Sequence, residues 1–203
     1  MPGCGSGEPW PAAAGLIGAA ARWREGAPGM LVLAIDGHGG SGKSTIAAAV
    51  AGATGAALVH TDDFFRSAGA AQGEQRPLQS YYDWQRLRAQ ALEPLRARRG
   101  ASFRRFDWDL GSGLDGVVSV EPAELIVVEG VFSASPELAD QVDRAVFVDT
   151  PEPERLRRLR GRVAPEEWDD EWLRAEQAYF RLIRPPSSFD LIVPGTFGGG
   201  GVT

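Results

Sequence analysis

Short apolar runs alternate with longer segments of mixed polarity along this chain. Five runs of three to six residues have the largely apolar character of strands buried on both faces of a parallel sheet; they lie at residues 30–35, 56–60, 125–128, 145–148 and 191–193. Ala-rich or amphipathic spacing between the runs predicts helices at residues 11–25, 45–53, 80–99, 153–161 and 166–183. Strands that alternate with helices predict an α/β fold with a five-stranded parallel sheet.

Residues 102–120 break this alternation, because they combine aromatic residues, three glycines and two short β-like pieces. That pattern predicts a small β-hairpin insertion. The chain contains no internal repeat and no linker that divides it. We therefore expect one domain over residues 1–203, with a substrate-side insertion at about residues 66–120.

The first apolar run ends in a glycine-rich turn, GHGGSGKS at residues 37–44, which fits the pattern G-x-x-x-x-G-K-[ST] between a strand and a helix. Glycines allow backbone N–H groups to converge on phosphate oxygens, and the helix N-terminus adds partial positive charge. Lys43 would reach the β- and γ-phosphates, and the Ser44 hydroxyl would bind Mg²⁺. The expected nucleotide-binding residues are Gly37, Gly39, Gly40, Ser41, Gly42, Lys43, Ser44 and Thr45. The turn predicts a nucleoside triphosphate site without separating a kinase from a GTPase or a motor ATPase.

Composition narrows the class of protein. A net charge of −6 without a large block of one sign disfavours a nucleic-acid surface. The apolar runs are too short for a membrane span, the N-terminus does not resemble a signal peptide, and one cysteine excludes an internal disulfide framework. We therefore expect a cytoplasmic protein. Lys43 is the only lysine among 21 basic residues, which excludes the Asn-Lys-x-Asp guanine reader of GTPases and places a compact ammonium where a phosphate loop needs one.

Carboxylates follow two of the apolar runs. Asp62 and Asp63 come after the second run, and Glu129 comes after the third. Right-handed crossovers place these strand ends on one edge of the sheet, where ligands bind. Asp62 would accept the proton of a hydroxyl nucleophile, and Ser44, Glu129 and Asp62 would form the metal side. The alternatives are a turn or helix cap for the aspartates and a solvated strand end for Glu129.

Residues 153–165 are rich in arginine and follow the fourth apolar run. We expect a helical lid that closes over ATP, with arginines that neutralise the charge developing on the transferred phosphoryl group. Arg158 and Arg162 lie four positions apart and so share a helical face. With Lys43 and Asp62 they are the expected catalytic residues. The alternative is a solvated helix face.

Taken together and in order, these segments resemble the uridine kinase and phosphoribulokinase group of P-loop kinases, which includes nicotinamide riboside kinases. Residues 62–65, DDFF, resemble the family's Asp-Asp/Ser-Phe-Phe/Tyr, whose first aspartate is the catalytic base. Residues 82–83 resemble the site of its ribose-binding aspartate, and residues 127–130, VVEG, resemble its metal-side Glu-Gly. Residues 146–162 and 189–193 are similar to its lid strand with arginines and to its last core strand.

The resemblance covers about residues 30–194 and implies a P-loop NTPase three-layer sandwich, with ATP and Mg²⁺ as cofactors and a hydroxyl as phosphoryl acceptor. Where uridine kinases carry a base-contacting histidine, residues 106–111 here read FDWDLG. Family members often form dimers or tetramers, so a homo-oligomer is an open expectation. Aromatic packing within the hairpin is the alternative role for Trp108. The expected acceptor-binding residues are Asp62, Phe65, Tyr82, Asp83, Asp107 and Trp108.

Three hypotheses stay open. The first is an ATP-dependent kinase whose acceptor is a nucleoside or riboside or, alternatively, a non-nucleoside small alcohol or pathway intermediate, with no nucleic-acid or membrane partner. The second is a nucleotide-binding regulatory module with slow ATP hydrolysis. The third is a paralogue that binds ATP without catalysis, against which the intact Lys43, Ser44, Asp62 and Glu129 argue. Acceptor-dependent ADP release separates the first hypothesis from the others.

Overall fold

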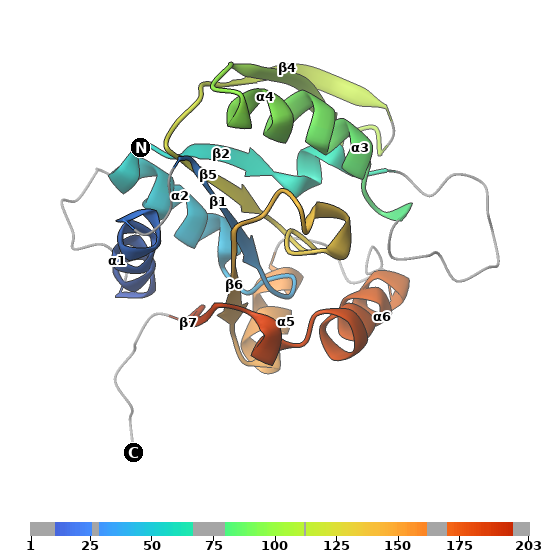
Figure 1. The fold of residues 1–203 in the computed structure, drawn as a ribbon. Coiled ribbons are helices and arrows are strands. Elements are labelled where there is room, and N and C mark those ends of the chain that lie inside the picture. The colour runs from blue at the N-terminus through green and yellow to red at the C-terminus, as the bar shows by residue number, and fades with distance from the viewer. Residues whose placement is uncertain (1–10, 26–28, 67–79, 112, 162–169, 197–203) are drawn as a thin grey trace, which may run out of the picture.

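The computed structural model describes residues 11–25, 29–66, 80–111, 113–161 and 170–196. Its centre is a five-stranded parallel sheet in the order β2-β5-β1-β6-β7, as the sequence predicts (Figure 1). All residues of the central strand β1 and of its neighbour β5 are buried, which explains their unbroken apolar runs. The strands are β1 (Leu31–Asp36), β2 (Ala57–His60), β5 (Leu125–Glu129), β6 (Arg144–Asp149) and β7 (Leu191–Pro194).

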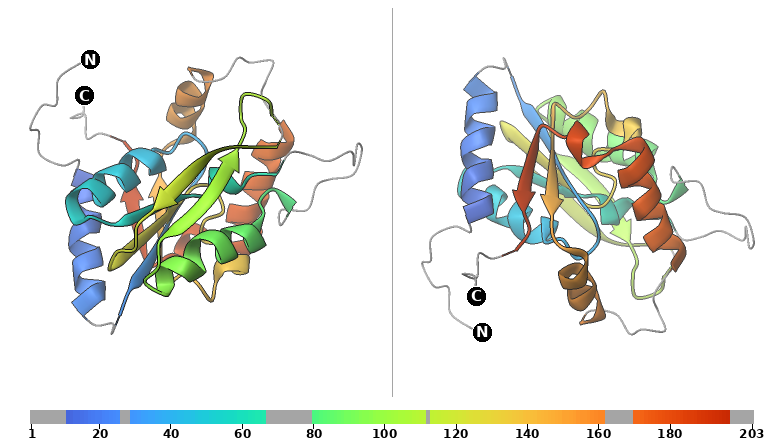
Figure 2. Two further views of the ribbon diagram at one scale, coloured as in Figure 1. Left: turned by 90° about the horizontal axis from the view of Figure 1, so that it is seen from above. Right: turned by 90° about the horizontal axis from the view of Figure 1, so that it is seen from below.

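Alternate side chains of β1 point to two different helical layers. Leu31, Leu33 and Ile35 pack in a core cluster with α1 (Pro11–Glu25) and α2 (Lys43–Thr54). Val32 belongs to a second cluster, on the face covered by α3 (Trp84–Leu87), α4 (Glu93–Arg96) and α6 (Asp170–Ala178). Figure 2 shows the sheet between these layers. The expected three-layer α/β sandwich is therefore confirmed.

Two predicted helices differ in their bounds and geometry. The helix expected over residues 80–99 begins at Trp84, because the Asp83 side chain accepts the Arg86 N–H at 3.1 Å and caps it. Its middle is a π-helical segment, Arg88–Leu92, which joins α3 to α4. The helix expected over residues 166–183 is described from Asp170 and ends in a second π-helical segment, Tyr179–Ile183.

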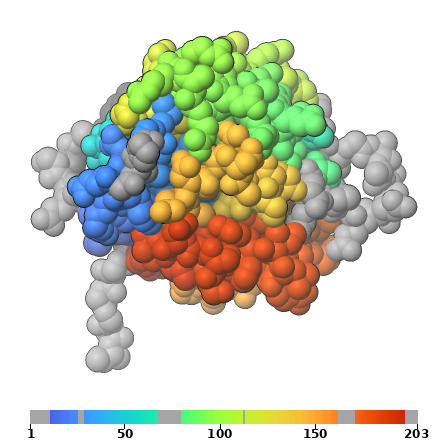
Figure 3. Space-filling view, viewed as in Figure 1, coloured from blue at the N-terminus to red at the C-terminus, as the bar shows by residue number. Residues whose placement is uncertain are grey.

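The remaining elements frame the C-terminal edge of the sheet. β3 (Ala101–Phe106) and β4 (Leu114–Val120) form the predicted antiparallel hairpin. Figure 3 shows the segment after β5 (yellow-orange) between the green α3–α4 region and the red α6 on one face of the molecule. The segment predicted as a lid, residues 153–165, begins within α5 (Glu152–Arg160), and its residues 162–165 lie outside the described residues. Short 3₁₀ helices lie at Thr61–Phe64, Pro136–Leu138 and Pro186–Ser188.

Helices in the described part of the chain all fall short of the length and apolar character that crossing a membrane requires.

Candidate active site

The phosphate loop joins the end of β1 to the start of α2. Gly37, Gly40 and Gly42 have φ angles of 144°, 74° and 98°, which side chains disfavour. A Cβ atom on Gly37 would lie 2.7 Å from the Val148 carbonyl oxygen, and one on Gly40 would lie 2.7 Å from the Arg155 carbonyl oxygen. The glycines are therefore required both by the curl of the turn and by its close packing on β6 and α5.

The start of α2 is open to an anion. Gly42 is the N-cap residue of α2 and has no side chain that could cap the helix. The first N–H groups of α2 therefore keep the partial positive charge of a helix N-terminus. Ser44 and Thr45 are exposed in the first turn. Lys43 is 7% exposed, and its ammonium donates to the His38 carbonyl oxygen at 3.0 Å. The loop backbone thus holds the Lys43 ammonium in place.

Ser41 and Thr150 fix the base of the loop. Ser41 is fully buried, and its carbonyl oxygen accepts a hydrogen bond from the Thr150 hydroxyl at 2.9 Å. Gly195 follows β7, and a Cβ atom there would lie 2.0 Å from the same Ser41 carbonyl oxygen. The ends of β6 and β7 are therefore packed directly against the phosphate loop.

Arginines of α5 reach the phosphate loop. Arg158 donates from its Nη1 to the carbonyl oxygens of Gly40, at 3.2 Å, and Gly195, at 2.9 Å, and from its Nε to Glu154 at 2.8 Å. The contact with Gly40 links α5 to the loop, whereas the lid role of α5 and the catalytic role of Arg158 stay predictions. Arg162 lies outside the described residues.

Oxygen atoms suited to Mg²⁺ lie beside the loop. The Ser44 hydroxyl donates to the Glu129 Oε2 atom at 3.2 Å. Glu129 is 4% exposed, so it is not a solvated strand end. Mg²⁺ binds through a few protein oxygens together with water and substrate phosphates, and this hydroxyl–carboxylate pair fits that requirement. Among the described residues, no three or more His, Cys, Asp and Glu side chains form a metal-binding group by themselves.

His60 adds a partner to the Glu129 carboxylate. Its Nδ1 atom lies 2.5 Å from Glu129 Oε1. The hydrogen bond to Glu129 raises the pKa of His60, while burial of the ring opposes that change. The carboxylate is thereby held between the Ser44 hydroxyl and an imidazole, an arrangement that the sequence analysis did not predict.

Asp62 lies in the 3₁₀ helix after β2. Its Oδ1 atom accepts the hydroxyl hydrogen of buried Tyr82 at 3.1 Å. Loss of hydration and the charge of Glu129 raise the pKa of the Asp62 carboxyl, while the Lys43 ammonium opposes them. Asp62 is therefore within electrostatic reach of both the phosphate-loop lysine and the metal-side carboxylate.

Asp63 is in a different environment from its neighbour. Loss of hydration raises the pKa of Asp63, and the charges of His60, Arg105 and Arg86 oppose that rise. The Asp63 carbonyl oxygen accepts a hydrogen bond from Arg86 Nη2 at 2.7 Å. Asp62 is thus the aspartate more closely coupled to the phosphate loop.

Aromatic side chains collect beside Asp62. The Phe65 ring centroid lies 4.9 Å from that of Trp108 and 5.7 Å from that of Tyr82. Trp108 is 57% exposed and so presents free ring surface. Trp172 of α6, which sequence reasoning missed, joins them at 6.1 Å from Phe65. Three expected acceptor-binding residues are thus brought together.

The other two expected acceptor-binding residues have structural partners. Asp83 caps α3 and pairs with Arg66 at 3.0 Å. Burial alone would raise its pKa, but hydrogen bonds from the Arg86 N–H and the Arg66 guanidinium lower it. Asp107 Oδ1 accepts the backbone N–H groups of residues 109 and 110 at 3.1 and 2.9 Å. Contacts of Asp83 and Asp107 with an acceptor stay predictions.

Two buried carboxylates at the site were missed. Asp36 is the last residue of β1, and Glu176 lies on α6 four positions after Trp172; they are 0% and 1% exposed. Asp36 directly follows the first apolar run and Glu176 lies within a predicted helix, and neither position carries a distinct sequence signal. Neither residue could be linked to the phosphate loop without the tertiary arrangement.

The sequence matches no protein-family model and no curated protein. Solved structures are similar. A candidate uridine kinase from Bacillus stearothermophilus superposes with a TM-score of 0.67 at 20% identity, covering 90% of this chain and 97% of that one. A candidate fructose transport system kinase from Silicibacter has a TM-score of 0.62 at 21% identity, covering 90% and 98%.

A third structure, of a protein named YGR205w, has a TM-score of 0.59 at 12% identity and covers 91% of this chain and 94% of that one. The three matched structures are aligned over nearly their whole length. The chain therefore shares the P-loop fold of uridine kinase-like structures.

Proposed function

We propose that this chain is a phosphotransferase that moves the γ-phosphoryl group of ATP to a hydroxyl of a small molecule, with a nucleoside or riboside as the acceptor. The observation that supports this most is the position of Asp62. Its carboxyl lies within electrostatic reach of Lys43 and Glu129 and is oriented by the Tyr82 hydroxyl. A switch or motor ATPase has no need of a carboxylate placed to orient an alcohol.

The loop and Lys43 would bind the triphosphate in this reaction. Ser44 and Glu129 would hold Mg²⁺, which supplies charge neutralisation at the β- and γ-phosphates. The hydroxyl oxygen of the acceptor would attack the γ-phosphorus, and the bond between that phosphorus and the ADP oxygen would break. Asp62 would accept the proton that the hydroxyl loses. The raised pKa of Asp62 makes its carboxylate a better proton acceptor than an ordinary aspartate.

The aromatic residues favour an acceptor with a planar ring. Phe65 and exposed Trp108 offer ring surface beside Asp62, and stacking on aromatic faces is tolerant of the exact base. A small alcohol without a ring would leave that surface unused. The similar structures described as candidate uridine and fructose transport system kinases support transfer to an alcohol.

ADP release with a panel of nucleosides, ribosides, sugars and small alcohols tests the proposal. Turnover should require one class of acceptor and should be lost in Asp62→Asn. Asp63→Asn is the matched control, because it removes the neighbouring carboxylate, which faces Arg86 and Arg105. ADP release at one slow rate, whatever acceptor is added, would instead support the nucleotide-binding regulatory module.

A further inference from the structure

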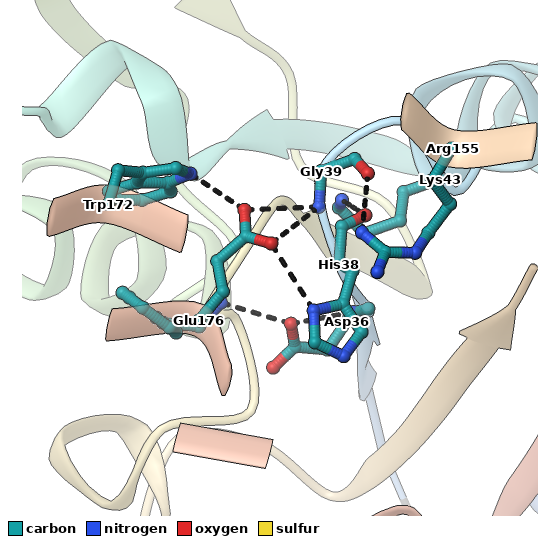
Figure 4. Close-up of polar contacts among 9 residues, drawn as sticks. Asp36, His38, Gly39, Lys43, Arg155, Trp172 and Glu176 are labelled. Atoms are coloured by element: carbon teal, nitrogen blue, oxygen red, sulfur yellow. Dashed lines mark hydrogen bonds and ion pairs between the residues drawn. The ribbon is translucent and has the colours of Figure 1, made fainter. Parts of the chain in front are cut away.

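Glu176 is a buried carboxylate that the proposed phosphoryl transfer does not use. Both of its oxygens lie 3.1 Å from the Gly39 N–H nitrogen. The Trp172 indole N–H donates to Oε1 at 2.6 Å, and His38 Nδ1 lies 3.2 Å from Oε2. Figure 4 shows the carboxylate between the indole and the two loop residues. Helix α6 is thus bonded directly to the phosphate loop.

The same two loop residues are also held by cations. Lys43 donates to the His38 carbonyl oxygen at 3.0 Å, and Arg155 donates to the Gly39 carbonyl oxygen at 3.3 Å. Figure 4 places Gly39 between Glu176 and Arg155. Both backbone polar groups of Gly39 are therefore bonded without a nucleotide. Because glycine is conformationally permissive, such a turn needs contacts of this kind to keep one shape.

Core packing does not explain a carboxylate at this position. Ala175 of α6 and Tyr179 and Phe180 of the following π-helical segment are buried in an apolar cluster. An apolar side chain would pack there without the cost of burying a charge. Among the described residues, the polar groups that contact the Glu176 carboxylate are the Gly39 N–H, the Trp172 indole N–H and the His38 ring nitrogen. Compared with an apolar residue, the carboxylate adds hydrogen-bonding contacts with Gly39 and His38 of the loop.

We propose that Glu176 is a positioning residue that keeps the Gly39 N–H and the His38 ring in the nucleotide-binding shape of the loop. This inference rests on the proposed function, because it takes the loop to be a nucleotide site. A loop held in shape before binding spares the nucleotide the entropic cost of ordering it. Loss of the Glu176 contacts with the loop should therefore weaken nucleotide binding.

Two substitutions with side chains of similar length distinguish the hydrogen bonds of Glu176 from its packing. Glu176→Gln can still accept the Gly39 N–H, whereas Glu176→Met fills the volume and accepts nothing. We expect ADP with Mg²⁺ to bind the Met variant about tenfold more weakly, the effect of one unsatisfied buried donor, and the Gln variant within about threefold of wild type. Arg174→Gln, an exposed change on the same helix, is the control.

Hydrogen exchange of the Gly39 amide, followed by NMR without nucleotide, gives a readout apart from affinity. It should be faster in Glu176→Met and stay protected in Glu176→Gln. Wild-type affinity and exchange in the Met variant would overturn the inference, as would an equal loss in both variants. If the Met variant does not fold, Trp172→Phe removes one donor to Glu176, and unchanged Gly39 exchange there would also overturn it. Failure of the wild-type protein to bind ADP would instead refute the proposed function.

Discussion

Asp36 provides a prediction whose size follows from the structure. This fully buried carboxylate accepts hydrogen bonds from the Gly37, Phe132 and Ala134 N–H groups at 2.7, 3.0 and 3.0 Å and from the Tyr179 hydroxyl at 2.9 Å. It ties the end of β1 to the segment after β5 and to the π-helical segment that follows α6. Burial nevertheless dominates and raises the pKa of Asp36 from 3.8 to about 6.

The sign of the pH effect follows from proton uptake. Between the unfolded pKa of 3.8 and the folded pKa of about 6, the folded protein keeps the Asp36 proton that the unfolded chain has lost. The contribution to stability is therefore fully present below about pH 4 and is lost as the pH rises through about 6. A shift of about two pKa units corresponds to about 3 kcal/mol.

Urea unfolding of wild type and Asp36→Asn between pH 4 and pH 7 measures this contribution. Other groups titrate in both proteins, so the difference between the two free-energy profiles isolates Asp36. The stability of wild type relative to the variant should fall by about 2–3 kcal/mol over this range. A difference that stays constant, or one that grows with pH, would refute the reasoning that burial outweighs the four hydrogen bonds.

Four other predictions concern single residues, three of them at the same edge of the sheet and one, Gly52, near the far end of α2. Gly130→Ala should lower the free energy of unfolding by about 2 kcal/mol or more, because the φ of Gly130 is +139° and a Cβ there would lie 1.9 Å from Thr61 Oγ1. Gly52 lies on α2 with open space around it, so Gly52→Ala should instead raise the free energy of unfolding by about 0.5–1 kcal/mol in the same urea assay. Lys43→Met should weaken ATP binding about tenfold or more by calorimetry, since a charge-assisted contact is lost, and unchanged affinity would contradict the role of the loop. Glu129→Gln should raise the Mg²⁺ concentration for half-maximal activity about tenfold, and an unchanged Mg²⁺ dependence would remove Glu129 from the metal side.

Features encoded locally could be predicted from the sequence. The five strands are continuous apolar runs because both faces of the sheet are covered, and the loop at residues 37–44 combines glycines that its φ angles and packing require. Helix bounds were less predictable. The amphipathic pattern of residues 80–99 continues upstream of Asp83. In the structure the helix begins only after Asp83, because that side chain caps its N-terminus, and residues 80–83 run beside Phe65 instead.

Contacts between distant segments could not be predicted. Asp36 and Glu176 accept hydrogen bonds from N–H groups that include those of residues 96 and 137 positions away. Asp83 and Asp107 illustrate the reverse case, because residues expected at the acceptor satisfy backbone N–H groups nearby. The sequence alone does not reveal whether an acidic residue contacts a distant segment or accepts hydrogen bonds from nearby backbone N–H groups.

Transfer of label from γ-³²P-ATP is the most direct test of the account. Wild-type protein should move the label onto the hydroxyl of a ring-bearing acceptor. Asp62→Asn should slow that transfer about 10²- to 10⁴-fold, the range for loss of a general base, while ADP affinity stays unchanged. Equal transfer rates in wild type and Asp62→Asn, or label recovered only as inorganic phosphate with every acceptor, would contradict it.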